Sequence, residues 1–316
     1  MKGILWAAGA VAVPAAVNAI VAARAGKMEQ PLPGDIAYYD WVYGRVAFYR
    51  LGQGPPVVLV HNPNAGASAW EWRKVFPELA NTHTVYALDL LGYGISEKPD
   101  IPYRGSLYAD LLHDFLEDVV GHPAHIIGSA LGASYAVNVA VRRPELVERL
   151  VLVNPTGTTS HLSTVTRGVT LGIMQAPVVG TSIYYSLVSR PGIERELREH
   201  IYYDPTFVTP EMVDFLHASA HQPGSQHAAV AFVTGLLDLP MRMAFADIDQ
   251  PTLLIWGRDA EYTPVGDAAD LLYRDPKAQL SIFDDCGMLP HDEKAGEFIR
   301  TVRPFLLGTT TGEIAA

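Results

Sequence analysis

The stretch HIIGSALGASYA, residues 125–136, decides the fold. Its apolar start ends at Gly128, and alanine-rich sequence follows Gly132. This is the pattern of a buried strand, a sharp turn and a helix, with glycines two places before and two places after position 130 so that strand and helix can nearly touch. Such a nucleophile elbow is written G-x-S-x-G. Here Ala130 stands at the serine position, so the sequence predicts the turn without its hydroxyl.

The sequence around this turn alternates short apolar runs with helical patterns. Strand-like runs are RVAFYRLG (45–52), PPVVLVHN (55–62), TVYALDL (84–90) and VERLVLVNP (147–155). Between them, SLYADLLHDFLEDVVG (106–121) carries apolar residues at helical spacing. Strands that alternate with helices predict an α/β fold with a doubly wound, mostly parallel sheet.

The alternation divides the chain. Residues 158–246 break the rhythm with aromatic-rich helical sequence, and strand patterns return in QPTLLIWGRD (250–259) and AQLSIFDDCG (278–287). We therefore expect one core, made of residues 28–157 and 247–309, with a helical cap at 158–246 inserted into it. Residues 1–27 form a separate hydrophobic N-terminal segment.

That N-terminal segment predicts a membrane anchor. Residues 4–23 carry no charge over about the length that a bilayer-spanning helix needs, with Lys2 before them and Arg24 and Lys27 after. A cleaved signal peptide and a core-packing helix stay open as alternatives. We expect a membrane-associated protein with a lipid membrane as partner. Positive charge on both flanks leaves the side of the membrane open.

Composition and net charge limit the classes of ligand that the protein is expected to bind. A net charge of −11 disfavours nucleic acid and makes a neutral or apolar small molecule the easier ligand. Cys286 is the only cysteine, so an internal disulfide is excluded. Spacings such as His-Glu-x-x-His or Cys-x-x-Cys do not occur, so we expect no metal and no cofactor.

From about residue 35 to 307 the chain resembles the α/β-hydrolase fold superfamily of the cap-bearing type. Five segments carry the resemblance in the right order. They are VVLVHNPNAGASAWEWRKVFPELA (the oxyanion loop), VYALDLLGYGISEKP, GSALG (the elbow), LLIWGRDAEYTP (the strand before the acid) and FDDCGMLPHDE (the histidine segment). The resemblance implies hydrolase chemistry with a Ser-Asp/Glu-His triad at the carboxyl edge of the sheet.

Checked position by position, the triad is absent. Ala130 stands at the nucleophile, Ala260 at the acid and Met288 at the histidine. Asp259 lies one place before the acid position. In the oxyanion loop the expected donor falls on Pro63, which has no N–H. The resemblance therefore implies the fold with degenerate triad positions.

Displaced residues are weak catalytic candidates. Ser129 stands in the variable position of the elbow, because Ile127 and Leu131 are too large to serve as the flanking small residues of a turn centred on it. His291 in PHDE commonly accompanies the catalytic histidine in the family, and a structural role is expected. Asp259 has no histidine at the expected place to orient.

Two functions compete. The absent triad favours a pseudoenzyme, a non-hydrolytic binder of a small apolar or lipid-like ligand at the membrane. The alternative is a non-standard hydrolase or lyase acting on a small ester-like or lipid-like substrate, so enzymatic activity stays open. In either case we expect an apolar pocket near residues 62–66, 129–131, 260–262 and 288. The expected ligand-binding residues are His61, Asn62, Asn64, Ser129, Ala130, Leu131 and Met288.

Overall fold

The computed structural model describes residues 28, 30–156, 164–174, 176 and 178–309. Its centre is an eight-stranded sheet with the order β1-β2-β4-β3-β5-β6-β7-β8. The strands are β1 (Asp35–Trp41), β2 (Gly44–Leu51), β3 (Pro56–Val60), β4 (Thr84–Leu88), β5 (Ala124–Ser129), β6 (Val147–Val153), β7 (Thr252–Gly257) and β8 (Gln279–Phe283). Strands β1 and β2 pair antiparallel, as do β2 and β4, and all pairs from β4 to β8 are parallel.

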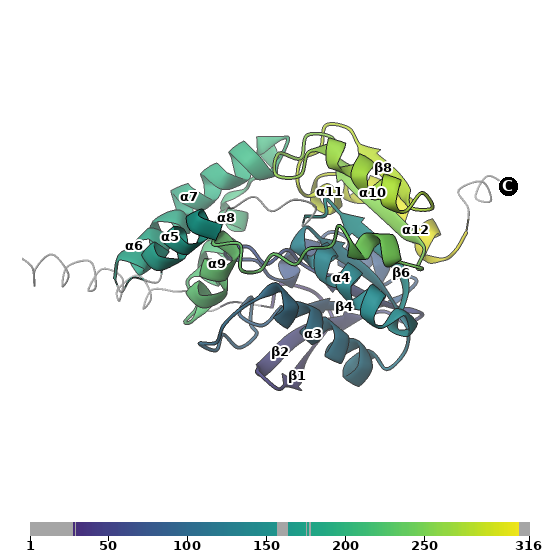
Figure 1. Cartoon of the computed structure of the whole chain (residues 1–316), viewed down its shortest axis with the longest axis horizontal. Helices are drawn as coiled ribbons and strands as arrows, with labels where there is room; N and C mark the ends of the chain where they lie inside the picture. The colour runs from purple at the N-terminus through teal and green to yellow at the C-terminus, as the bar shows by residue number, and fades with distance from the viewer. Residues whose placement is uncertain (1–27, 29, 157–163, 175, 177, 310–316) are drawn as a thin grey trace, which may run out of the picture.

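Helices cover both faces of the sheet (Figure 1). On one face lie α3 (Gly105–Phe115), α4 (Leu131–Arg142) and α10 (Ala268–Arg274), and on the other lie α2 (Phe76–Leu79) and α12 (Ala295–Leu306). The short α11 (Pro290–Glu293) precedes α12. The predicted α/β class, with a doubly wound and mostly parallel sheet, is confirmed.

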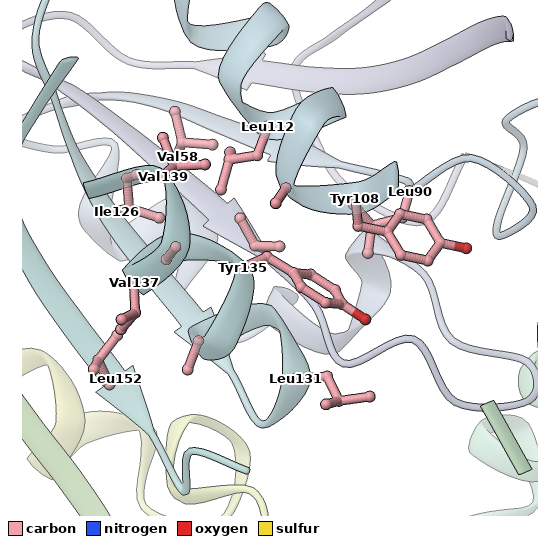
Figure 2. Packing of buried hydrophobic residues seen from close by; sticks show 14 of the residues in the cluster. Val58, Leu90, Tyr108, Leu112, Ile126, Leu131, Tyr135, Val137, Val139 and Leu152 are labelled. Carbon is pink, nitrogen blue, oxygen red and sulfur yellow. The ribbon is translucent and has the colours of Figure 1, made fainter. Parts of the chain in front are cut away.

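The apolar runs of the central strands explain this layering. Every residue of β4, β5 and β7 is buried, as a parallel strand covered on both faces requires. Alternate side chains enter opposite clusters: Ile126 packs with α3 and α4, while Ile127 packs with α2 and α12. Figure 2 shows the first cluster, with Ile126 and Val58 from the sheet facing Leu112 of α3 and Val139 of α4.

In the described part of the segment between β6 and β7, five α-helices gather beside the carboxyl ends of the strands (Figure 1). They are α5 (Thr164–Met174), α6 (Val179–Leu187), α7 (Arg190–Glu196), α8 (Pro210–Ala220) and α9 (Ser225–Val233). The loop after β3 packs directly on α8, because a Cβ on Gly66 would come within 2.7 Å of the Leu216 carbonyl oxygen. The inserted helical cap is therefore present, while its limits at 158 and 246 stay a prediction.

The membrane prediction is corrected. Among the described residues, no helix has the length and apolar character to span a bilayer. The expected anchor at 4–23 falls on residues 1–27, which lie outside the described residues. The predicted transmembrane helix, membrane partner and membrane-associated location therefore have no support in this structure, and none is assigned to the protein.

Candidate active site

The elbow keeps a strained backbone although its serine is missing. Ala130 has φ 48° and ψ −111°, a conformation that non-glycine residues rarely adopt. Glycine is required on both sides. A Cβ on Gly128 would lie 2.6 Å from the Ala133 nitrogen, and one on Gly132 would lie 2.5 Å from the Val60 carbonyl oxygen. Close packing of helix against strand therefore holds the turn, whatever side chain stands at position 130.

The turn leaves a backbone donor free. Ala130 N–H donates to the Val153 carbonyl at 2.9 Å, and Ala133 N–H donates to the Ala130 carbonyl at 3.2 Å. Leu131 N–H, the first donor of α4, has no acceptor in the described part of the chain. Unpaired N–H groups at a helix start favour negative charge, so the elbow retains one donor for an oxyanion.

The two residues that follow Asn62 in the oxyanion loop offer no free N–H. Pro63 has no N–H, and its carbonyl accepts a hydrogen bond from the Tyr93 hydroxyl at 2.6 Å. Asn64 N–H is already bonded to the Asn62 carbonyl at 2.9 Å. The Asn62 side chain is different, because its Oδ1 is buried and has no partner among the described residues. This carboxamide is therefore the free polar group that the loop retains near the elbow.

His61 has a structural role. It is fully buried, its Nε2 accepts from Leu90 N–H at 3.1 Å, and its Nδ1 lies 3.0 Å from the Asn62 carbonyl oxygen. Burial lowers the pKa of His61, against the opposing influence of Glu71. The ring is therefore neutral, with Nδ1 protonated, and both nitrogens are used to hold the loop between β3 and β4.

The acid and histidine positions hold apolar side chains. Ala260 is 4% exposed and Met288 is 6% exposed, and both belong to the apolar cluster that contains Leu131. Asp259, one place before Ala260, is exposed, so it does not enter the site. The Thr263 hydroxyl lies 3.7 Å from the Met288 sulfur. Ala260 and Met288 therefore belong to one apolar cluster together with Leu131, the residue after Ala130.

Asn154 connects the chain segments that carry the missing triad positions. It follows β6 at φ 41°, a left-handed conformation that asparagine tolerates. Its Nδ2 donates to the carbonyls of Gly287 (3.2 Å) and Met288 (2.9 Å), and its Oδ1 accepts from Gly257 N–H (3.0 Å). One buried amide therefore joins β6, β7 and the loop of the missing histidine.

A carboxylate–imidazole pair lies beside the oxyanion loop. His291 is fully buried on the Trp72 ring, with centroids 4.3 Å apart, and its Nε2 is 3.3 Å from Glu71 Oε1. The other oxygen, Glu71 Oε2, accepts from Asn62 N–H at 3.2 Å. Sequence reasoning found His291 but missed Glu71. Glu71 lies between Trp70 and Trp72 in the sequence, and this position does not predict that its carboxylate points into the protein.

Ser129 lies on the same side of the sheet as this pair. It is the last residue of β5, two places after Ile127, so the two side chains share one face of the strand. Ile127 packs in the cluster of Trp72, on which His291 lies. Ser129 is 2% exposed and its hydroxyl has no recorded partner within the described residues.

The described residues hold no cluster of three or more His, Cys, Asp or Glu side chains that could bind a metal ion. Of the two titratable candidates, Asp259 is exposed and His291 is buried. The chemistry available at the elbow therefore consists of the Leu131 N–H, the Asn62 carboxamide, the Ser129 hydroxyl and the Glu71–His291 pair.

Comparison with known proteins agrees with this architecture. The model of the Alpha/beta hydrolase family matches residues 57–301. The 2-hydroxymuconate semialdehyde hydrolase of Pseudomonas sp. (strain CF600) is 29% identical over 83% of this chain and 90% of its own length. The 2-hydroxy-6-oxo-2,4-heptadienoate hydrolase of Pseudomonas putida is 29% identical over 82% and 91%. A solved serine hydrolase involved in carbazole degradation superposes with a TM-score of 0.73 at 23% identity, covering 87% of this chain and 99% of its own.

These relatives correct the functional prediction. A non-hydrolytic binder, or pseudoenzyme, at a membrane is wrong, because the chain matches named hydrolases over more than four-fifths of its length. The prediction equated loss of the triad at Ala130, Ala260 and Met288 with loss of chemistry. It gave the displaced polar groups too little weight, and Glu71, which bonds to the oxyanion loop at Asn62 N–H, was not among the groups considered.

Proposed function

The chain belongs to the Alpha/beta hydrolase family, and on that premise we propose that it hydrolyses small, mostly apolar carbonyl compounds at the elbow, with water in place of the serine nucleophile. The observation that carries the proposal is the strained turn at Ala130 with its unpaired Leu131 N–H. That donor is suited to the negative charge that develops on a carbonyl oxygen under attack.

The oxyanion needs a second donor, and we assign it to the Asn62 side chain. A Cβ on Gly132 would lie 3.0 Å from the His61 carbonyl, so this loop lies against the first turn of α4. The Asn62 Oδ1 atom is buried without a partner among the described residues, and a half-turn of the carboxamide places Nδ2 there instead. A bound carbonyl oxygen would then accept from both Leu131 and Asn62, which compensates for Pro63.

Proton transfer falls to the Glu71–His291 pair. In the proposed step a water at the oxyanion loop gives a proton through Glu71 to the buried His291. The hydroxide oxygen bonds to the carbonyl carbon, and the leaving group departs with that proton when the intermediate collapses. Glu71 stabilises the imidazolium that exists between the two transfers. Ser129 ends a regular strand and lacks the elbow turn, so its hydroxyl is assigned to binding water or substrate.

The substrate class follows from the side chains and the relatives. Leu131 and Met288 are apolar, and the relatives are named for hydrolysis of 2-hydroxymuconate semialdehyde and 2-hydroxy-6-oxo-2,4-heptadienoate. The proposed ligand-binding residues are those expected from sequence except His61, whose ring nitrogens hold the loop: Asn62, Asn64, Ser129, Ala130, Leu131 and Met288. Of the weak catalytic candidates, Ser129 and His291 keep a role in the proposal, whereas the exposed Asp259 has none.

The test is turnover of p-nitrophenyl acetate and butyrate by the purified chain, with fluorophosphonate labelling mapped by mass spectrometry. We expect turnover above the buffer rate without a labelled serine. Asn62→Ala should lower kcat by about 10- to 1000-fold with KM little changed, as loss of an oxyanion donor does. Ser106→Ala, at an exposed helical serine, is the control. Turnover equal to buffer would refute the proposal, and stoichiometric labelling of Ser129 would replace water with a serine nucleophile.

A further inference from the structure

A cavity of about 560 Å³ lies between the core and the cap, away from the elbow. The core side comes from η1 (Ala69–Trp72) and the two residues after it, and the cap side comes from η5 (Pro205–Phe207) and α8. The cavity is lined by Trp70, Arg73, Lys74, Thr206, Phe207, Thr209, Glu211, Met212 and Phe215. None of these residues belongs to the site proposed at Ala130, so we call this cavity the aromatic groove.

Three of the nine residues that line the groove are aromatic: Trp70, Phe207 and Phe215. Trp70 and Phe215 stack with centroids 4.7 Å apart and an interplanar angle of 21°. The Arg73 guanidinium lies 3.6 Å from the centroid of Trp70, which fixes the indole between core and cap. Phe207 lies under the Lys74 ammonium at 4.8 Å. The wall therefore places two cations directly against aromatic rings.

The two cations share a single buried carboxylate. Arg73 Nη2 is 2.8 Å from Asp292 Oδ2, and Lys74 Nζ is 3.0 Å from Asp292 Oδ1. Burial alone would raise the pKa of Asp292, but Arg73, Tyr202 and Lys74 outweigh it and hold that pKa below its ordinary value. Asp292 is therefore ionised, and one positive charge on this wall remains without a buried partner among the described residues.

We propose that the aromatic groove binds a small aromatic monocarboxylate, with its ring against Phe207 and Phe215 and its carboxylate on Arg73 and Lys74. Asp292 and Glu211 balance Arg73 and Lys74 in number, but Asp292 is buried whereas both cations line the groove. The volume lies in the range of ligand pockets. Glu211 also lines the groove and is exposed, so it would repel a second negative charge on the ligand.

The ligand identity is tested by calorimetric titration of the full chain with 1-naphthoate and with 1-naphthalenemethanol, which has a similar ring system but no charge. We expect naphthoate to bind with Kd at or below about 1 mM and the alcohol at least about tenfold more weakly. Failure of naphthoate to bind the folded chain, or equal affinities for the two compounds, would overturn the proposal.

Variants test the location. Lys74→Gln leaves Asp292 paired with Arg73 and should weaken naphthoate binding about three- to tenfold, while Glu211→Gln should strengthen it about twofold. Phe215→Ala should also weaken it, and Lys277→Gln, at an exposed distant lysine, should not change it. Unchanged affinity in both Lys74→Gln and Phe215→Ala would refute the groove. Ser129→Ala should bind naphthoate normally, so this result stands apart from any failure of the proposed hydrolase activity.

Discussion

Glu71 and His291 form a buried carboxylate–imidazole pair, with Oε1 and Nε2 3.3 Å apart and side-chain exposures of 10% and 0%. His291 lies on Trp72, in the cluster opposite the one that holds the triad positions. Glu71 also holds Asn62 N–H, so one carboxylate connects the imidazole to the oxyanion loop. The proton transfer that we propose for the elbow depends on this connection.

Glu71→Gln should lower kcat for p-nitrophenyl esters by about 10- to 100-fold, because a neutral amide cannot stabilise imidazolium. The free energy of unfolding should fall by about 1–2 kcal/mol, since the bond to Asn62 becomes a weaker neutral one. Steady-state kinetics and urea unfolding measure the two effects. Glu199→Gln, at an exposed residue, is the matched control. If the Glu71→Gln variant has the kcat of the wild type, Glu71 takes no part in the reaction.

Ala130→Ser alone should not create a serine hydrolase. The new hydroxyl would stand on the strained turn, but Met288 cannot take its proton and Ala260 cannot orient a base. We expect no fluorophosphonate adduct at position 130 and an esterase rate within about twofold of wild type. Adding Met288→His and Ala260→Asp should produce labelling. Labelling of the single variant would mean that another group already acts as a base at this position.

Asn154→Ala should destabilise the fold by about 2–4 kcal/mol, because it leaves two buried carbonyls and one N–H of neighbouring segments unpaired. Asn154→Gly relieves the backbone strain at φ 41° but should be destabilised almost as much, because the same hydrogen bonds are lost. Urea unfolding compares both with Asn81→Ala, at an exposed asparagine, which should change stability by less than about 0.5 kcal/mol. A loss confined to Asn154→Ala would assign the effect to backbone strain.

Stability should fall in mild acid partly through His125. Burial lowers the pKa of His125 to about 4, with His83 and Arg149 adding to the effect. Between the ordinary pKa of about 6.5 and about 4, the unfolded chain binds a proton that the folded chain does not. The contribution of neutral, buried His125 to the free energy of unfolding is therefore fully present above about pH 6.5, and it is lost as the pH falls toward about 4. It amounts to about 1–3 kcal/mol.

His125→Leu should flatten this dependence. Urea unfolding at neutral pH and in mild acid, between the two pKa values of His125, should give a smaller difference in free energy for the variant than for wild type. His122→Leu, at an exposed histidine shortly before β5, should keep the wild-type difference. Equal differences in all three proteins would contradict the assignment to His125.

The sequence by itself determined the sheet and the elbow, and it predicts that the standard triad is absent. Apolar runs such as those around Ile126 and Ile127 must be buried on both faces, which only a covered parallel sheet allows. The glycines flanking Ala130 determine the turn because their requirement is local. The identities at Ala260 and Met288 could likewise be read directly from their spacing to these landmarks.

Only the tertiary structure decided which polar groups meet. Glu71 faces His291, and Asn154 reaches Gly287 and Met288, because segments distant in the chain converge at the carboxyl edge of the sheet. No local pattern encodes such a contact, since the inward turn of one carboxylate depends on what packs beside it. Local spacing therefore located the triad positions in the sequence. Tertiary packing decided which polar side chains lie near those positions.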